Sequence, residues 1–176
     1  MASTAPVEVR DWIRDIPDFP KPGVLFKDIT PLLSNPHAFR RAIDLLEEQF
    51  RDRGIDVIAA AEARGFIFGA PLALRMNAGF VPIRKPGKLP YATIAQEYLL
   101  EYGADKLEIH SDALAAGHRV LLLDDVLATG GTMRACCDLV QSTGAELVGC
   151  AFVLELSFLG GRAKLEPMDV FSLVTY

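Results

Sequence analysis

The chain has 176 residues, of which 51% are hydrophobic and 23% are charged. This composition is ordinary for a globular protein and excludes disordered and fibrous classes, while the length suits one domain. With 18 basic and 23 acidic residues the formal net charge is −5, which argues against a protein that coats nucleic acid. No apolar run reaches the roughly 18 residues that a membrane-spanning helix requires. We therefore expect neither nucleic acid nor a membrane as a partner.

The cysteines predict a reduced, intracellular protein. Cys136, Cys137 and Cys150 are odd in number, lack the C-x-x-C spacing and have no histidine nearby. They indicate neither a disulfide framework nor a zinc site. Because all three lie in apolar stretches, we expect buried thiols in a cytoplasmic protein and no metal site built from protein ligands.

The N-terminal part is predicted to combine helices with a loop. Apolar residues at helical spacing predict a helix over residues 9–16. Residues 17–31 are rich in Pro and Gly, so we predict a loop, and its apolar side chains indicate that it lies against the body of the protein. Asn35 is a helix N-cap with Pro36 at the first helical position, and Gly54 is expected to end that helix.

Strands alternate with helices in the rest of the chain. The predicted strands are Asp56–Ala61, Phe80–Ile83, Arg119–Asp124, Leu147–Leu154 and Val170–Val174. The predicted helices are Gly65–Arg75 and Thr132–Thr143, and the segments Thr93–Tyr102 and Lys106–Ile109 are expected to form an antiparallel ribbon. Such alternation is typical of an α/β sandwich with a mostly parallel sheet. Ligands bind at the carboxyl ends of the strands in these sheets, so the residues that follow the strands are candidates for the site.

The strongest motif is VLLLDDVLATGGT, residues Val120–Thr132. An apolar strand ends in two carboxylates, Asp124 and Asp125, and a short loop of small residues leads into a helix. Backbone N–H groups of such a loop and the helix N-terminus favour an anion. Carboxylates beside an anion cradle suit a ligand with both hydroxyls and phosphate, such as a ribose 5-phosphate. An N-capping turn with a solvated acid pair would explain Asp-Asp alone but not the whole string.

This motif resembles the phosphoribosyl-pyrophosphate (PRPP) signature of type I phosphoribosyltransferases. Further segments narrow the resemblance to the adenine-specific members of that family. They are PGVLFKDI (Pro22–Ile29), EARGF (Glu62–Phe66), RKPGKLP (Arg84–Pro90) and LEYG (Leu100–Gly103). Together the segments cover nearly the whole chain.

The resemblance implies a fold and a reaction. The expected fold is an α/β, type I phosphoribosyltransferase fold with a mostly parallel central sheet flanked by helices, a flexible flap and a small N-terminal hood. Residues 1–176 would form a single domain, with residues 1–34 as the N-terminal helix and base-binding hood. The reaction would transfer the 5-phosphoribosyl group from PRPP to adenine in purine salvage, giving AMP and pyrophosphate. It would require Mg²⁺, bound mainly through PRPP, pyrophosphate and water, and a homodimer.

The PRPP contacts are assigned by the same resemblance. The residues that would hold the 5′-phosphate are Ala128, Thr129, Gly130, Gly131 and Thr132. Asp124 and Asp125 would face the ribose hydroxyls and support the cation that develops on the sugar, without ligating Mg²⁺ directly. The residues that would contact pyrophosphate are Ala63, Arg64, Arg84, Lys85 and Lys88, and part of the last three would reach the neighbouring subunit's site. A non-proline cis peptide bond is expected at or next to Ala63–Arg64.

Catalysis and base selection are assigned to the flap and the hood. Residues 94–103 would form a flap over the site, with Glu101 and Tyr102 at its tip and Glu101 as the general acid–base for adenine N7. The expected adenine contacts are Leu25, Phe26, Lys27 and Leu159. Phe26 would stack on the purine, while backbone groups of its two neighbours read the adenine edge. Taken alone, Glu101 is better explained as an exposed acid at a hairpin edge, and Arg64 as a member of a surface ion pair.

Three alternative functions remain open at the level of sequence. An enzyme for another base, notably xanthine, would share the PRPP motif, but PGVLFKDI and RKPGKLP together disfavour it. A PRPP-sensing transcriptional regulator usually adds a DNA-binding domain or a basic surface, and this acidic chain has no spare length. A structural protein with a degenerate site is opposed by the intact set of motifs.

Overall fold

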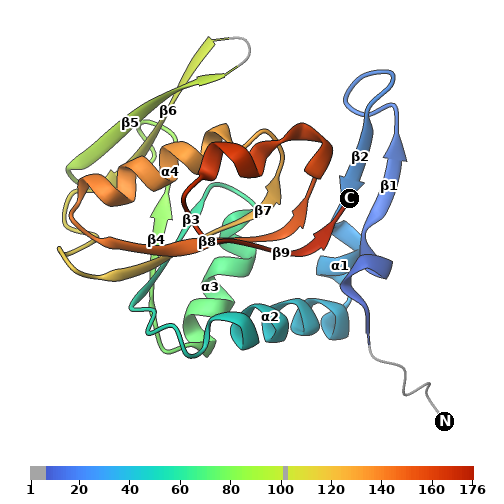
Figure 1. The fold of residues 1–176 in the computed structure, drawn as a ribbon, viewed down its shortest axis with the longest axis horizontal. Coiled ribbons are helices and arrows are strands. Elements are labelled where there is room, and N and C mark those ends of the chain that lie inside the picture. Colours follow the sequence, from blue (N-terminus) through green and yellow to red (C-terminus); the bar gives the residue numbers. More distant parts are fainter. Residues whose placement is uncertain (1–6, 101–102) are drawn as a thin grey trace. The chain divides into compact units, whose positions relative to one another are not determined.

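The computed structural model describes residues 7–100 and 103–176 (Figure 1). The chain divides into two compact units, Met1–Leu45 and Leu46–Tyr176. In the described part of the chain, no helix is both long and apolar enough to cross a membrane.

The first unit contains a small hairpin and the start of a long helix. A 3₁₀ helix, η1 (Val9–Trp12), precedes the strands β1 (Arg14–Pro17) and β2 (Leu25–Asp28), which pair antiparallel. The short helix α1 (Thr30–Ser34) is followed by α2 (Pro36–Phe50). As predicted, Asn35 caps α2, because its Oδ1 accepts the N–H groups of His37 and Ala38, both at 3.0 Å.

Two predictions for this unit were wrong. The helix expected over residues 9–16 ends at Trp12, and the loop expected over residues 17–31 contains β2. Strand pairing overrides the helical spacing here, because β1 places Arg14 opposite Asp28 and Asp15 opposite Lys27. Both opposed pairs form ion pairs at 2.6 Å, which stabilises the hairpin.

The second unit is built on a parallel sheet. Its strands are β3 (Val57–Ala61), β4 (Gly79–Ile83), β7 (Arg119–Leu127), β8 (Glu146–Glu155) and β9 (Val170–Thr175). They lie in the order β4-β3-β7-β8-β9, and every neighbouring pair is parallel. The predicted α/β fold with a mostly parallel sheet is confirmed. β7 runs three residues beyond the prediction, because Val126 and Leu127 still pair with the end of β8.

Helices cover both faces of this sheet (Figure 1). α3 (Gly65–Arg75) and α4 (Gly131–Ser142) match the predicted helices closely. α4 packs on the face formed by residues such as Ala59 and Leu122, while α3 meets the other face, where Gly69 approaches Ala60. Because both faces are covered, β3 is buried throughout, and β7 reads as a buried apolar run up to Asp124.

The predicted antiparallel ribbon is also confirmed. β5 (Thr93–Leu100) pairs with β6 (Gly103–His110) as a separate two-stranded sheet that extends past α4 (Figure 1). Ile109 and Leu107 of β6 are buried in the main core, so the base of the ribbon is anchored. After β8, two short 3₁₀ helices, η2 (Ser157–Leu159) and η3 (Gly161–Leu165), lead toward β9.

Candidate active site

The segments that follow β3, β4, β7 and β8 meet at one edge of the sheet, because all these strands are parallel. They carry EARGF, the basic run beginning at Arg84, the loop Ala128–Thr132 and the 3₁₀ helices after Glu155. The sequence motifs that are far apart in the chain are thus brought together by the topology.

Arg64 and Asp125 form an ion pair at this edge through Arg64 Nε. The Asp125 side chain is buried, with 5% exposed, whereas Arg64 is 54% exposed. The hydrogen bond to Asp125 raises the pKa of the Arg64 guanidinium. The pair is made through Nε, so the two NH₂ groups of the half-exposed guanidinium can still donate to a bound anion. Arg64 is therefore both the counter-ion of a buried carboxylate and a donor for a bound anion.

The Asp124 side chain lies beside the start of α3 and accepts a hydrogen bond from the backbone of Asp125. A Cβ at Gly65 would lie 2.9 Å from the Leu123 carbonyl oxygen and 3.1 Å from Asp124 Oδ1, so glycine is needed where α3 begins. Asp124 Oδ1 accepts the N–H of Asp125 at 2.8 Å. Burial, followed by the charge of Asp125, raises the pKa of Asp124 well above its usual range. Two adjacent carboxylates therefore differ: one is paired with a cation and the other is not.

The loop Ala128–Thr132 is a backbone cradle at the start of α4. Gly130 is the N-cap of α4 with φ of 78°, and no side chain caps this helix end. The first-turn N–H groups and the helix dipole therefore point at the loop without a protein acceptor from a capping side chain. An anion is the natural partner of such a helix end.

The segment after β3 is tied to the segment after β4. The Glu62–Ala63 peptide bond is cis, so the expected non-proline cis bond lies next to Ala63–Arg64 as predicted. Arg84 Nε donates to Glu62 Oε2 at 2.7 Å, and its NH1 donates to the Lys88 carbonyl oxygen at 3.2 Å. Lys85 and Lys88 are exposed on the same short loop.

The ribbon is joined to this basic loop. The backbone N–H of Arg84 donates to the Glu108 carbonyl oxygen at 2.9 Å, and the return bond measures 2.7 Å. Glu108 Oε2 also accepts the N–H of Gly87 at 3.3 Å. Strand β6 therefore holds the basic loop in position through these hydrogen bonds of Glu108.

The other predicted site residues fall in three places. Leu25, Phe26 and Lys27 lie on β2 in the first unit, where Phe26 contacts Phe19 edge-on with ring centroids 5.1 Å apart. Leu159 ends η2 and is 42% exposed. Glu101 and Tyr102 lie outside the described residues.

Sequence reasoning missed two carboxylates that organise this edge. Glu62 binds Arg84, and Glu155 is only 4% exposed and binds Arg162 through both oxygens. The signal for both was available, since each residue ends or directly follows a buried strand at the carboxyl edge.

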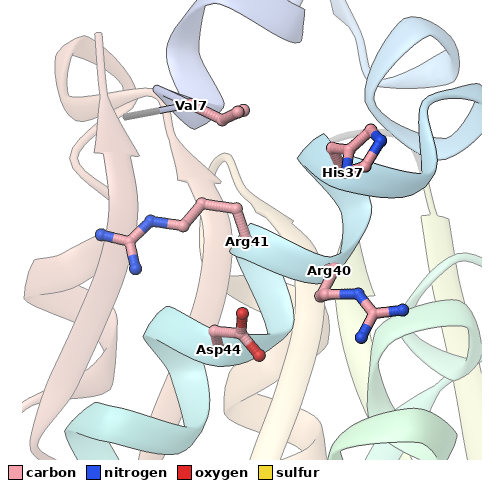
Figure 2. Close-up of a pocket in the computed structure, with 5 residues that line it drawn as sticks. All are labelled: Val7, His37, Arg40, Arg41 and Asp44. Atoms are coloured by element: carbon pink, nitrogen blue, oxygen red, sulfur yellow. The ribbon is translucent and has the colours of Figure 1, made fainter. Parts of the chain in front are cut away.

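A separate cavity of about 430 Å³ lies in the first unit. Its lining residues are Val7, His37, Arg40, Arg41 and Asp44 (Figure 2). Figure 2 shows the guanidinium groups of Arg40 and Arg41 pointing in opposite directions, so the two cations do not converge on one ligand. We assign no function to this cavity.

Comparison with known proteins agrees with the geometry. Residues 28–171 match the family model for a phosphoribosyl transferase domain. An adenine phosphoribosyltransferase of Maridesulfovibrio salexigens is 58% identical over 168 residues, which are 96% of this chain and 99% of the relative. The chain belongs to the adenine phosphoribosyltransferase family. It is therefore a pentosyltransferase enzyme, which excludes the regulator and degenerate-site alternatives.

Solved structures of the family confirm the type I phosphoribosyltransferase fold. Adenine phosphoribosyltransferase from Thermoanaerobacter pseudethanolicus matches with a TM-score of 0.93 at 54% identity, covering 96% of this chain and 98% of that one. The Saccharomyces cerevisiae enzyme, complexed with D-2,5-dideoxy-2,5-imino-altritol 1,6-bisphosphate and adenine, matches with a TM-score of 0.89 at 44% identity. It covers 94% of this chain and 96% of that one.

Proposed function

We propose that this phosphoribosyltransferase transfers the 5-phosphoribosyl group of PRPP to adenine and releases AMP and pyrophosphate, as a purine-salvage enzyme of the cytoplasm. The proposal rests on the groups that meet at the carboxyl ends of the parallel strands. An uncapped helix N-terminus, a pair of unlike carboxylates and two arginines lie there together. The family's adenine enzymes, including one complexed with adenine, support adenine as the base.

Ala128–Thr132 bind the 5′-phosphate through backbone N–H groups, while Asp124 and Asp125 accept the ribose hydroxyls. Charge builds on the leaving pyrophosphate as the anomeric carbon becomes cationic. Arg64 and Arg84 neutralise that charge, assisted by Lys85 and Lys88. The buried Asp125 carboxylate lies close enough to this edge to favour the developing cation on the sugar. The protein's contribution is thus positioning and electrostatic stabilisation.

Mg²⁺ fits this site as a companion of the substrate. Within residues 7–100 and 103–176, no group of three or more His, Cys, Asp or Glu side chains is arranged to hold a metal ion. Asp125 is already paired with Arg64, and burial raises the pKa of Asp124 well above its usual range. We therefore propose that PRPP oxygens and water would provide most ligands and that Asp124 and Asp125 would not ligate the ion directly. When bound, Mg²⁺ supplies positive charge to the pyrophosphate.

Base selection is assigned to two separate segments. Phe26 stacks on the purine, backbone groups of Leu25 and Lys27 read its edge, and Leu159 closes its other face. Lys27 Nζ is held by Asp15 at 2.6 Å, which supports a backbone rather than a side-chain role for Lys27. Glu101 serves as the general acid–base, with Tyr102 beside it. Glu101→Gln should lower kcat by about 100-fold or more when chemistry limits the rate, and an unchanged kcat would contradict that role.

We propose a homodimer as the active form. α3 presents Leu74, 83% exposed, and Ile67, 38% exposed, and an exposed apolar helix face favours association. Part of the basic run Arg84–Lys88 would reach the partner's site. Arg84→Ala and Asp125→Asn variants, each impaired by itself at low PRPP concentration, should regain activity when mixed and refolded together. No recovery in a mixture shown to contain heterodimers would contradict sharing.

One assay tests the reaction. The protein is incubated with PRPP, Mg²⁺ and, in turn, adenine, hypoxanthine, guanine and xanthine, and the nucleotide formed is measured by liquid chromatography. Adenine should give AMP and an equimolar amount of pyrophosphate. A folded protein that makes no AMP, or that prefers xanthine, would overturn the proposal. Omission of Mg²⁺ with a chelator present should abolish turnover.

A further inference from the structure

The residues after β8 press directly against the loop Ala128–Thr132. A Cβ at Gly161 would lie 2.2 Å from the Ala128 carbonyl oxygen and 3.0 Å from the Gly130 nitrogen. Conversely, a Cβ at Gly130 would lie 2.4 Å from the Gly161 carbonyl oxygen. Real Cβ atoms do not tolerate contacts this short, so the two backbones touch only because both residues are glycine.

This contact is made from a segment that is firmly anchored. Arg162, the residue after Gly161, donates to both carboxylate oxygens of Glu155, at 3.0 Å from Nε and 2.5 Å from NH2. Its NH1 donates to the Val170 carbonyl oxygen at 2.8 Å, and Ser172 donates to Glu155 Oε2 at 2.8 Å. Glu155 is buried, and these hydrogen bonds, led by that of Arg162, lower its pKa. The anchor thus joins the end of β8 to β9.

The backbone adds two further attachments. Leu156 N–H donates to the Leu127 carbonyl oxygen at 2.9 Å, just before the phosphate loop begins. Ser157 N–H donates to the Tyr176 carbonyl oxygen at 3.0 Å, and its hydroxyl reaches the same oxygen at 2.5 Å. The segment that carries Gly161 is therefore held from β7, β8 and β9 together.

We propose that Gly161 is a positioning residue for the 5′-phosphate loop, and that the Arg162–Glu155 pair holds it in place. The backbone contact with Gly161 fixes the position of the loop, and thereby how closely its N–H groups approach one another and the phosphate. It contacts the loop and not the ligand, so it acts through Ala128 and Gly130. This inference rests on the proposed function for its substrate, but the structural contact itself does not.

Adding a single methyl group at Gly161 tests this backbone contact. Gly161→Ala should displace the loop and raise KM for PRPP about 100-fold, while KM for adenine changes less than about threefold. Gly160→Ala is the neighbouring control, because nothing lies within 4 Å of the Gly160 Cβ position, although Gly160, unlike Gly161, has a positive φ of 65°. Gly160→Ala therefore adds backbone strain but no steric clash with the loop, so its KM for PRPP should stay near that of the parent.

A second pair of variants tests the anchor and does not depend on the first. Arg162→Gln should raise KM for PRPP about tenfold, and Arg162→Lys, which keeps the charge but not the forked contact, should raise it less. A general loss of stability would lower the active fraction without this selective rise. An unchanged KM for PRPP in folded Gly161→Ala or, if that variant does not fold, in Arg162→Gln would overturn the inference.

Binding without turnover separates this inference from the proposed reaction. Titration of the parent and variant proteins with ribose 5-phosphate in a calorimeter reports on binding by the loop and the ribose contacts, without pyrophosphate, adenine or turnover. Gly161→Ala should weaken that binding at least tenfold and Gly160→Ala should not. Failure of the parent to make AMP would contradict the proposed function but would leave this binding comparison valid. Equal ribose 5-phosphate affinity in the parent and Gly161→Ala would contradict the positioning role.

Discussion

The two ends of the site that we propose to bind the 5′-phosphate and the pyrophosphate are built on opposite principles. The 5′-phosphate loop, Ala128–Thr132, offers backbone N–H groups, small residues and the end of α4, and contains no basic side chain. The pyrophosphate end offers Arg64 and Arg84, each already bound to a carboxylate. Close backbone packing fixes the loop at the first end, whereas ion pairs with carboxylates hold the two arginines at the second.

This difference would allow an acidic chain to bind the highly charged substrate that we propose. At the loop, rigid backbone dipoles provide the attraction, so net charge is irrelevant. At the other end, Asp125 and Glu62 hold the arginines in place and compensate their charge. The total of −5 therefore reports on the surface as a whole and not on the site. The comparison predicts that steric changes damage the loop most, whereas charge changes damage the pyrophosphate end.

The largest effect is expected from Gly130→Ala. Its Cβ would meet the Gly161 carbonyl oxygen, and φ of 78° already disfavours a side chain. We expect kcat/KM for PRPP to fall roughly 100-fold or more, measured by steady-state kinetics. Gly117→Ala is the control, because φ is 83° but nothing lies within 4 Å. If Gly130→Ala loses no more activity than the control, packing does not shape the loop.

Arg64→Gln should affect stability and activity together. It leaves the buried Asp125 without its cation, which should lower the free energy of unfolding by roughly 1–3 kcal/mol, reduced by the exposure of Arg64. Urea unfolding measures this change. The double variant Arg64→Gln/Asp125→Asn should recover the stability but not the activity. Recovery of both would mean that Arg64 acts only as a counter-ion.

Removing single cations from the basic loop should have a moderate effect. Arg84→Ala and Lys88→Ala should each raise KM for PRPP about tenfold, and added salt should reduce the difference from the parent. Arg51→Ala provides the control, because this exposed residue follows α2 and precedes the amino end of β3, opposite the site edge. An equal rise in all three variants would mean that only the overall charge matters.

The smallest change in stability, and one of opposite sign, is expected from Asp124→Asn. The raised pKa of Asp124 means that its charge opposes folding, so stability is lost as pH rises above about 4. The variant should melt about 2–4 °C higher at pH 7, while the difference vanishes below pH 4 and kcat falls. Asp112→Asn, at an exposed position, is the control. A lower melting temperature for Asp124→Asn at pH 7 would contradict the account.

The buried strands and the phosphate motif were predictable because their signals are local. Val57–Ala61 and Val120–Leu123 are compact apolar runs typical of buried strands, and Asn35–Pro36 starts α2 through hydrogen bonds within three residues. The hairpin of β1 and β2 was missed because its stabilising ion pairs join residues that are 12 and 14 positions apart. Helical spacing over residues 9–16 carried no information about that partner.

By itself, the sequence determined the α/β class, from its alternating strands and helices, and the family, from short motifs in a fixed order. Only the tertiary structure decided which charges are paired. Arg64 binds Asp125 across 61 positions, and Arg84 binds Glu62 across 22. Only it revealed that Gly161 touches Gly130. These relations arise because parallel strands bring their carboxyl ends together, and distance along the chain does not encode that proximity.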